Sequence, residues 1–218
     1  MTERVTLVLA SSNRAKIVEF RALLSDLPVD VVGMSEALPE KIAIVEGSDS
    51  FEENAILKAR TVADLAITLA LGDDSGLEVD ALGGRPGVRS ARFAHERATD
   101  AENNAALLAA LADVEPDQRT ARFRCVLALV DPWALPGSGP ILAEGTCEGF
   151  IAKEPRGGAG FGYDPLFIVK GTAETMAELG DAQKNAVSHR GRAVQALRPR
   201  LSALLEQRSR DARLIANR

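Results

Sequence analysis

The alternation of apolar and polar positions predicts strands and helices in turn along the first part of the chain. Residues 5–10 form an apolar run of the length of a buried strand. After a polar loop, Ile17, Phe20 and Leu24 recur at the spacing of an amphipathic helix. Residues 29–32 predict a second strand. Strand, helix and strand in this order indicate an α/β fold.

The next helix and strand lead to a pair of acids. Ser50 followed by Glu53 is the signature of a capping box and predicts a helix that continues to about residue 65. The apolar run 67–71 then predicts a buried strand that rises into Asp73-Asp74. The Ser-Gly pair after the acids is typical of a turn. We therefore expect both carboxylates at the end of this third strand, where α/β sheets collect ligands.

The second half of the chain begins with a helix and continues as a hairpin. Thr99 and Glu102 predict the start of the helix. Residues 120–130 alternate between apolar and charged side chains, which is typical of a half-buried antiparallel strand. Residues 131–140 break every regular pattern and predict the hairpin loop, and residues 141–152 are the partner strand.

A leucine-rich helix is expected near the C-terminus. Ser188 is its predicted N-cap, which places His189 and Arg190 in the first turn. Cations there face the unfavourable end of the helix dipole. Donors that face a ligand would explain two such residues, and a solvated first turn would explain them as well.

Length, charge and cysteine content narrow the class of protein. The 218 residues suit one domain, 1–218, with two lobes that share a core, and the net charge of −5 argues against general nucleic-acid binding. No apolar run is long enough to span a membrane and no secretion signal is visible, so no membrane partner and a cytoplasmic location are expected. Cys125 and Cys147 are expected to be reduced thiols.

The acid pair predicts a metal site. Adjacent carboxylates repel each other unless a positive charge lies beside them, and Mg²⁺ prefers oxygen ligands. The alternative is a solvated turn in which an aspartate serves as a cap.

The first polar loop is a candidate phosphate site. Ser11, Ser12 and Asn13 precede a helix whose free backbone N–H groups stabilise an anion, and Lys16 lies in its first turn. Ordinary N-capping explains Ser12 and Asn13 almost as well.

A glycine-rich segment offers a candidate surface for a nucleobase. Residues 157–160 contain three glycines, followed by Phe161, Gly162, Tyr163 and Asp164. An aromatic ring among such small residues must be covered by something else, and a stacked base would cover it. The alternative is a tight turn whose Phe161 folds back onto the core.

Six motifs together make the sequence resemble one family, the cytosolic pyrophosphatases that hydrolyse non-standard purine nucleoside triphosphates. The resemblance runs from about residue 5 to about residue 201. The motifs occur in the family's order and spacing, with Ser12 where glycine is usual: residues 11–16, 51–55, 73–77, 83–87 with 90–92, 161–165, and 188–191.

The resemblance implies an elongated mixed twisted β-sheet with flanking helices, two lobes around a central substrate cleft, and a homodimer. It implies Mg²⁺-dependent hydrolysis of ITP, dITP and XTP to the nucleoside monophosphate and pyrophosphate, which cleanses the nucleotide pool. Asp74 would be the general base and a Mg²⁺ ligand, with Glu46 near the metal. Glu40 lies in the same irregular stretch as an alternative, and Asp73 would orient ligands or metal waters.

Donors from His189 and Arg190 would favour a 6-keto purine, because an adenine would leave them unpaired in a dry pocket at a cost of about 1–3 kcal/mol. Lys16 and Lys58 would screen the phosphates. The expected substrate-binding residues are Ser11, Ser12, Asn13, Arg14, Ala15, Lys16, Lys58, Ser75, Phe161, Gly162, Tyr163, Asp164, Lys184, His189 and Arg190.

Two other functions fit parts of this pattern. The first is a related pyrophosphatase for modified pyrimidine or methylated nucleotides, since strand-end acids and a phosphate loop serve any such substrate. The second is a module that binds nucleotides without cleaving them. The acid pair weighs against the second, because a pure binder gains little from a general base beside phosphate.

Overall fold

A computed structural model describes residues 4–40, 42–47, 50–135 and 137–216. Its helices and strands follow in the order β1 (Val5–Leu9), α1 (Arg14–Leu23), β2 (Val29–Gly33), α2 (Met34–Ala37), α3 (Phe51–Ala66), β3 (Leu69–Val79), α4 (Asp100–Ala110), β4 (Thr120–Val130), β5 (Ile141–Ile151), β6 (Phe167–Val169), α5 (Asp181–Val187) and α6 (His189–Ala216). Three short 3₁₀ segments are η1 (Asp80–Leu82), η2 (Gly87–Arg92) and η3 (Pro116–Gln118).

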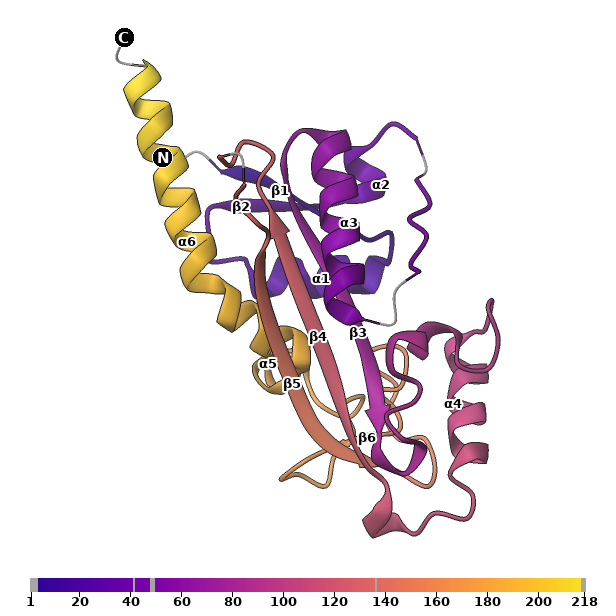
Figure 1. Cartoon of the computed structure of the whole chain (residues 1–218). Coiled ribbons are helices and arrows are strands. Elements are labelled where there is room, and N and C mark those ends of the chain that lie inside the picture. The colour runs from indigo at the N-terminus through magenta and orange to yellow at the C-terminus, as the bar shows by residue number, and fades with distance from the viewer. Residues whose placement is uncertain (1–3, 41, 48–49, 136, 217–218) are drawn as a thin grey trace.

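The strands form one mixed sheet in the order β2-β1-β3-β4-β5-β6. β1 pairs in parallel with β2 and β3, whereas β4, β5 and β6 continue the sheet antiparallel. Figure 1 shows β3, β4 and β5 as long, twisted strands that run the length of the molecule. The predicted fold class, an elongated mixed sheet with flanking helices, is therefore confirmed.

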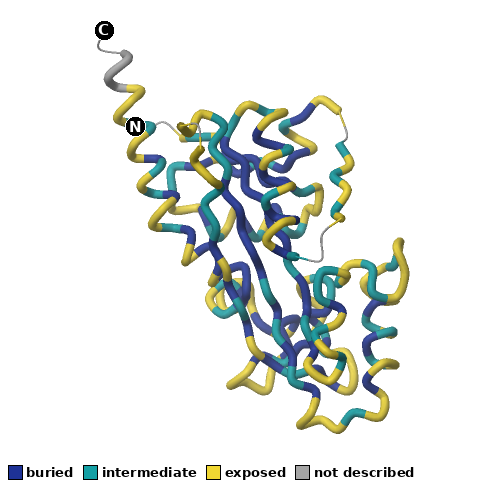
Figure 2. Tube along the Cα trace, viewed as in Figure 1, coloured by how far each residue is buried: buried dark blue, intermediate teal, exposed yellow. Residues whose placement is uncertain are grey.

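Helices cover both faces of the sheet. On one face, α1 and α6 pack on apolar residues of β1, β3 and β4, among them Leu9, Leu71 and Leu127. On the other face, α3 packs on Ala70 and Val126. At the far end of the long strands, α4 and the segment before β6 form a further apolar cluster with β3 and β4. The long strands are accordingly buried along most of their length (Figure 2).

The predicted end of the third strand is wrong. β3 continues for 11 residues through both acids and the Ser-Gly pair to Val79, because β4 pairs with it from Ala70 to Val79. The strand that ends at this point is β1, whose last main-chain bond to β3 joins Ala10 N to Leu71 O at 2.9 Å. In the described part of the chain, no strand pairs with this edge of β3 between Leu71 and the bridge from Glu78 to Pro86. The acids thus lie at an open side edge of β3.

Most predicted elements are present, and two short helices were missed. The strands, the hairpin and the helices with caps at Ser50 and Thr99 are confirmed within a few residues. The helix Met34–Ala37 lies in a stretch that was predicted to be irregular. Asp181–Val187 forms a helix separate from α6. Among the described residues, no helix combines the length and apolarity required to cross a membrane.

Candidate active site

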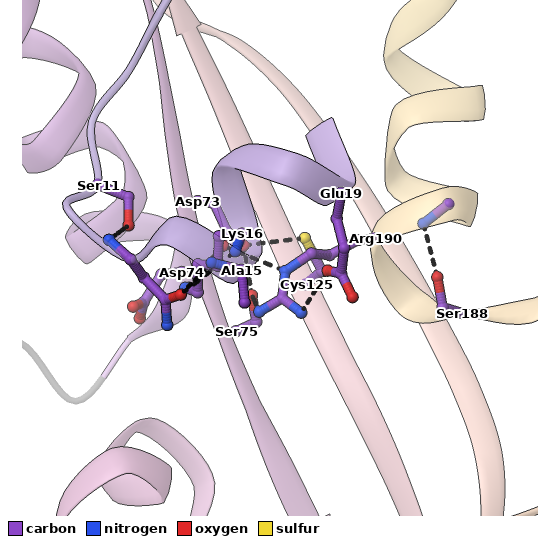
Figure 3. A network of polar contacts seen from close by, with 12 residues as sticks. Ser11, Ala15, Lys16, Glu19, Asp73, Asp74, Ser75, Cys125, Ser188 and Arg190 are labelled. Carbon is purple, nitrogen blue, oxygen red and sulfur yellow. Dashed lines mark hydrogen bonds and ion pairs between the residues drawn. The ribbon is translucent and has the colours of Figure 1, made fainter. Parts of the chain in front are cut away.

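The two adjacent acids serve different faces of the sheet. Successive side chains of a strand alternate in direction. Asp73 therefore points to the face covered by α1 and α6, and Asp74 points to the face covered by α3 (Figure 3). The expectation that Asp73 and Asp74 share one metal ion is not supported by this arrangement.

Asp73 is the centre of a buried ion-pair network. Its carboxylate lies 2.7 Å from Lys16 Nζ and 3.4 Å from Arg190 Nε. It also accepts hydrogen bonds from the Ser75 hydroxyl and, at 3.3 Å, from the Cys125 thiol. Burial alone would raise the pKa of Asp73, but the charges of Lys16 and Arg190 hold it well below its usual range. Asp73 is therefore ionised at neutral pH, and its carboxylate fixes the side chains of Lys16 and Arg190.

Glu19 extends this network to a third cation, Lys184. Its carboxylate lies 2.7 Å from Lys184 Nζ and 3.2 Å from Arg190 Nη1. Lys184 also forms an ion pair of 2.8 Å with Asp164. On this face, three acids and three cations are thus in mutual contact, and the network is balanced in charge. Because its charges are paired, it orients side chains without needing a further ion.

Asp74 faces α3 and has a different set of partners. Lys58 Nζ donates to Asp74 Oδ1 at 2.7 Å, and Asn54 Nδ2 donates to Asp74 Oδ2 at 3.2 Å. The same Lys58 ammonium lies 2.8 Å from Glu46 Oε1. Burial raises the pKa of Asp74 despite the charge of Lys58. A buried carboxylate with a raised pKa is suited to accept a proton.

Two carboxylates and a single ammonium meet on the α3 face, which leaves it with excess negative charge. Glu46 reaches this group through Lys58, whereas Glu40 is exposed, so the structure favours Glu46 of the two alternatives. No group of three or more metal-ligating His, Cys, Asp or Glu side chains occurs among the described residues. An open hollow of about 380 Å³ adjoins Glu46, and Arg89, Arg92 and Glu96 also line it.

The polar loop after β1 caps α1. Asn13 Oδ1 accepts from the N–H groups of Ala15 and Lys16 at 2.9 and 3.3 Å, and Ser11 Oγ accepts from Asn13 N at 3.1 Å. Ser12 contacts Ser35 through their hydroxyls at 2.9 Å. Capping therefore accounts for Asn13, and the exposed loop still presents its side chains beside Lys16. Arg14 is exposed as well.

Ser12 replaces the usual glycine without an unusual backbone. Ile67 is the single non-glycine residue with positive φ in the described part of the chain. Ser12 thus adopts a conformation that is open to any residue, and the loop needs no glycine here.

Phe161 lies over two cations rather than in the core. Its ring centroid is 5.3 Å from Lys184 Nζ and 5.1 Å from Arg190 Cζ. Asp164 Oδ2 accepts from Phe161 N at 3.1 Å and thereby fixes the loop to Lys184. Tyr163, in contrast, is 4% exposed and packs in the apolar core. The side chain of Tyr163 therefore belongs to the core, and the prediction that Tyr163 is a substrate-binding residue stays a prediction.

The first turn of α6 is buried. Ser188 Oγ accepts from Gly191 N at 3.1 Å, as an N-cap does. His189 and Arg190 are 4% and 6% exposed, so the alternative of a solvated first turn is wrong. The imidazole of His189 stacks on Phe123, and its Nδ1 has no hydrogen-bond partner among the described residues. Burial and the charge of Arg190 lower the pKa of His189 well below 6.5, so the ring is neutral at pH 7.

Three residues of the site were not recognised in the sequence. Glu19 occupies a polar position of an amphipathic helix, where an ordinary solvated acid is the default. Asn54 is fully buried in α3, and the only available signal was an amide on the apolar side of that helix. Cys125 continues the apolar alternation of β4, so nothing in the pattern separated it from the core.

The substrate side chains predicted from distant parts of the sequence do meet. Ser75, Lys16, Arg190, Lys184 and Phe161 form one connected set of contacts on the α1–α6 face. Lys58 Nζ also donates to the main-chain oxygen of Asp73 at 3.3 Å, which places the α3 group beside the backbone that carries both acids. Both groups therefore adjoin the open edge of β3.

Comparison with known proteins agrees with this geometry. A model of the Ham1 family matches residues 7–200. A dITP/XTP pyrophosphatase of Desulforamulus reducens is 50% identical over 190 residues, which are 87% of this chain and 92% of that protein. The protein of the same name from Bacillus subtilis is 46% identical over 200 residues, which are 91% of this chain and 96% of that protein. A solved HAM1 protein of Coxiella burnetii has a TM-score of 0.78 at 42% identity and covers 93% and 99%. The chain belongs to the Ham1 family.

Proposed function

We propose that this chain hydrolyses the non-standard purine nucleoside triphosphates ITP, dITP and XTP to the nucleoside monophosphate and pyrophosphate, with Mg²⁺ as cofactor. This reaction removes such nucleotides from the nucleotide pool. Relatives that are 46–50% identical to this chain carry the name dITP/XTP pyrophosphatase, which supports both the reaction and the substrate class.

The observation that carries the proposal is the open edge of β3, with the acids of Asp73 and Asp74 on its two faces. A nucleotide that crosses this edge places its base against Phe161 and Arg190 and its phosphates beside Lys16, Lys58 and Asp74. The two faces supply the two kinds of contact that a selective hydrolase requires, which are recognition of the base and a proton acceptor beside phosphate.

The α3 face fits a Mg²⁺ ion. Asp74 and Glu46 offer hard oxygen ligands and carry more negative charge than Lys58 neutralises. Mg²⁺ is commonly held by one or two carboxylates together with substrate phosphates and water, so two protein ligands suffice. When bound, the ion screens the phosphate charge against the approach of water.

Hydrolysis requires water to attack the α-phosphorus while the bond to the β,γ-pyrophosphate breaks. Asp74 accepts the proton of the attacking water, a role that its raised pKa favours. Asn54 holds Asp74 Oδ2 at 3.2 Å and so fixes the direction of the free lone pairs. Lys16, beside the exposed loop after β1, stabilises the charge of the phosphates.

The base is selected on the other face. His189 is neutral and buried, and the guanidinium of Arg190 is held by Asp73 and Glu19. Such fixed donors match the 6-keto acceptor of hypoxanthine and xanthine. An adenine amino group would leave them unpaired, at a cost of about 1–3 kcal/mol. Phe161 supplies the stacking surface, with Ser75, Asp164 and Lys184 around it.

We further propose that the chain is a single two-lobed domain that acts as a homodimer in the cytoplasm. The two free, buried cysteines suit a reducing compartment. Size-exclusion chromatography with light scattering tests the homodimer. We expect twice the mass of one chain, and the mass of a single chain would contradict the proposal.

The function is tested by measuring pyrophosphate release from ITP, XTP, GTP and ATP, each with Mg²⁺ and with a chelator. We expect release from ITP and XTP, with a kcat/KM for ATP that is at least about tenfold lower, and loss of activity with the chelator. Equal rates on ITP and ATP would refute the assignment of base selection. Nucleotide binding without pyrophosphate release would leave a binding module as the function.

A further inference from the structure

The loop that carries Phe161 is held at its neighbour Gly162 by the helix α4. Gly162 N donates to Asp100 Oδ2 at 2.7 Å, and Asn104 Nδ2 donates to Gly162 O at 2.9 Å. Asp100 and Asn104 are four residues apart and therefore lie on one face of the helix. Both polar groups of a single glycine are thus held by two side chains more than 50 residues away in the sequence.

The next residue is held from another direction. The hydroxyl of Tyr163 donates to Ser90 O at 2.8 Å. Ser90 in turn accepts from Leu77 N of β3 at 2.8 Å and donates to Gly87 O at 2.6 Å. The base loop is consequently tied both to α4 and, through Ser90, to the strand that carries the acids.

Two glycines give the loop a backbone that is costly to order. Gly160 and Gly162, which flank Phe161, have φ values of 80° and 62°. Glycine at such angles loses more conformational entropy on ordering than any other residue. The contacts of Gly162 with α4 therefore add to the hydrogen bond between Asp164 and Phe161 N and restrict the loop further.

Within the described ranges, the side chain of Asn104 makes no other hydrogen bond that would explain an asparagine here. Its Oδ1 is buried without a hydrogen-bond partner among the described residues, which is a cost that an apolar residue would not carry. The donation to Gly162 is the contact that accounts for an asparagine at this position of α4.

We propose that Asp100 and Asn104 are positioning residues of the base pocket, which hold Gly162 so that Phe161 is preorganised to stack on the purine. This inference rests on the proposed function, since it assigns a role to α4 in the same site. Neither residue touches the reacting atoms, so the clamp acts on binding of the base and leaves the proton-transfer step unchanged.

The variants Asn104→Ala and Asp100→Ala remove one bond each. Asp100→Asn is the conservative variant, because its amide oxygen still accepts from Gly162 N. Glu102→Ala is the matched control, because it removes the side chain that caps α4 at Thr99 and leaves both clamp residues in place. Thermal melting identifies any variant whose fold is lost.

Binding of inosine monophosphate by calorimetry measures the effect without turnover. We expect affinity to fall about three- to tenfold in Asn104→Ala and Asp100→Ala, and to stay within about twofold of the parent in Asp100→Asn and Glu102→Ala. With ITP, KM should rise in the two clamp variants at nearly constant kcat. Unchanged affinity in both clamp variants overturns the proposal.

Tyr163 is the single tyrosine of the chain, so 3-fluorotyrosine labels this loop alone. In protein without nucleotide, its fluorine resonance should shift or broaden in Asn104→Ala and Asp100→Ala and remain in place in Glu102→Ala. Identical spectra in all variants overturn the clamp. A parent protein that releases no pyrophosphate from ITP would instead refute the proposed function, and the fluorine spectra would still decide on the clamp.

Discussion

Adjacent residues in this protein carry out opposite electrostatic tasks. Asp73 and Asp74 have the same side chain and neighbouring positions, but the alternation of the strand places them in different surroundings. Two cations lower the pKa of Asp73, whereas burial raises that of Asp74. The same substitution at the two positions should therefore have different consequences.

Asp74→Asn is expected to abolish turnover and to leave the fold intact. Lys58 keeps Glu46 as its partner after this substitution, so stability should change little. Loss of a general base typically costs about 10²–10⁴ in rate. Pyrophosphate release from ITP and the melting temperature measure both parts, and activity within about tenfold of the parent would remove Asp74 as the base.

Asp73→Asn is expected to destabilise the protein. Lys16 and Arg190 would lose the buried anion that balances them, and removal of one partner of a buried ion pair costs about 3–5 kcal/mol. Urea unfolding measures the free energy of unfolding of Asp73→Asn, and Asp74→Asn is the variant for comparison. Equal stability of the two variants would contradict the assignment of the network to Asp73.

The lowered pKa of His189 predicts that the protein loses stability in mild acid. Its pKa is lowered in the folded state, so below about pH 6.5 the unfolded chain binds a proton that the folded chain excludes. Stability is therefore complete above pH 6.5 and falls with decreasing pH by up to about 1.4 kcal/mol per unit. Urea unfolding from pH 7.5 to 5 should show a steeper fall in the parent than in His189→Asn, and equal slopes would show that His189 is not the group.

At the scale of single residues, the sequence predicted which residues lie in the candidate site. It did not predict equally well how their side chains contact one another. Lys16, Phe161 and Arg190 were predicted from motif and chemistry, and they do lie together. Asp73 was predicted beside Asp74 at a metal because spacing along the chain does not show on which face of a sheet a side chain lies. Glu19 was missed because its two cationic partners come from the other end of the chain.

Between elements, glycine permits a close contact that sets the base pocket. A Cβ on Gly145 of β5 would lie 2.2 Å from His189 O and 2.3 Å from Ala193 N of α6. The strand therefore supports the first turn of α6 backbone against backbone, and this contact fixes the depth of His189 and Arg190 in the protein.

Gly145→Ala is expected to push the start of α6 away from the sheet. Overpacking of this kind costs about 1–3 kcal/mol, and displaced base-site donors should raise KM for ITP. Gly139→Ala is the control, because a Cβ there meets no atom within 4 Å. Calorimetric melting and KM of both variants make the comparison. A KM in Gly145→Ala equal to that of Gly139→Ala would show that the contact does not position the site.

Elements were predictable where a local signal marks them. The capping residues Ser50 and Thr99 and the alternation of β4 gave helices and strands within a few residues. The length of β3 could not be predicted from its local sequence. Pairing with β4 extends the strand past a Ser-Gly pair, which in other contexts often ends a strand. The length of a strand is set by its neighbours as much as by its own residues.

In the whole molecule, the proposed substrate site joins groups from distant parts of the chain. Lys16 and Arg190 come from α1 and α6, whereas Phe161 belongs to the loop that α4 holds. A bound nucleotide would therefore contact α1, α6 and the loop before β6, and its binding should stabilise the entire fold.

Saturation with inosine monophosphate is expected to raise the free energy of unfolding by about 2.7 kcal/mol at 100 times its Kd. Adenosine monophosphate at the same concentration serves as the control and should stabilise less, because its 6-amino group does not match the donors. Differential scanning calorimetry of the two mixtures tests this. An equal rise with both nucleotides would contradict base recognition by the folded state.

The open edge of β3 has a consequence for how this protein can change. The backbone of β3 lies between the residues proposed to bind the purine and Asp74, the proposed general base. Substitutions in one of these groups therefore need not affect the other. Substitutions around Phe161 and Arg190 should change which purine is accepted, whereas those around Asp74 should change the rate of cleavage. Substrate preference and the rate of cleavage are thereby separable properties of residues that flank one strand.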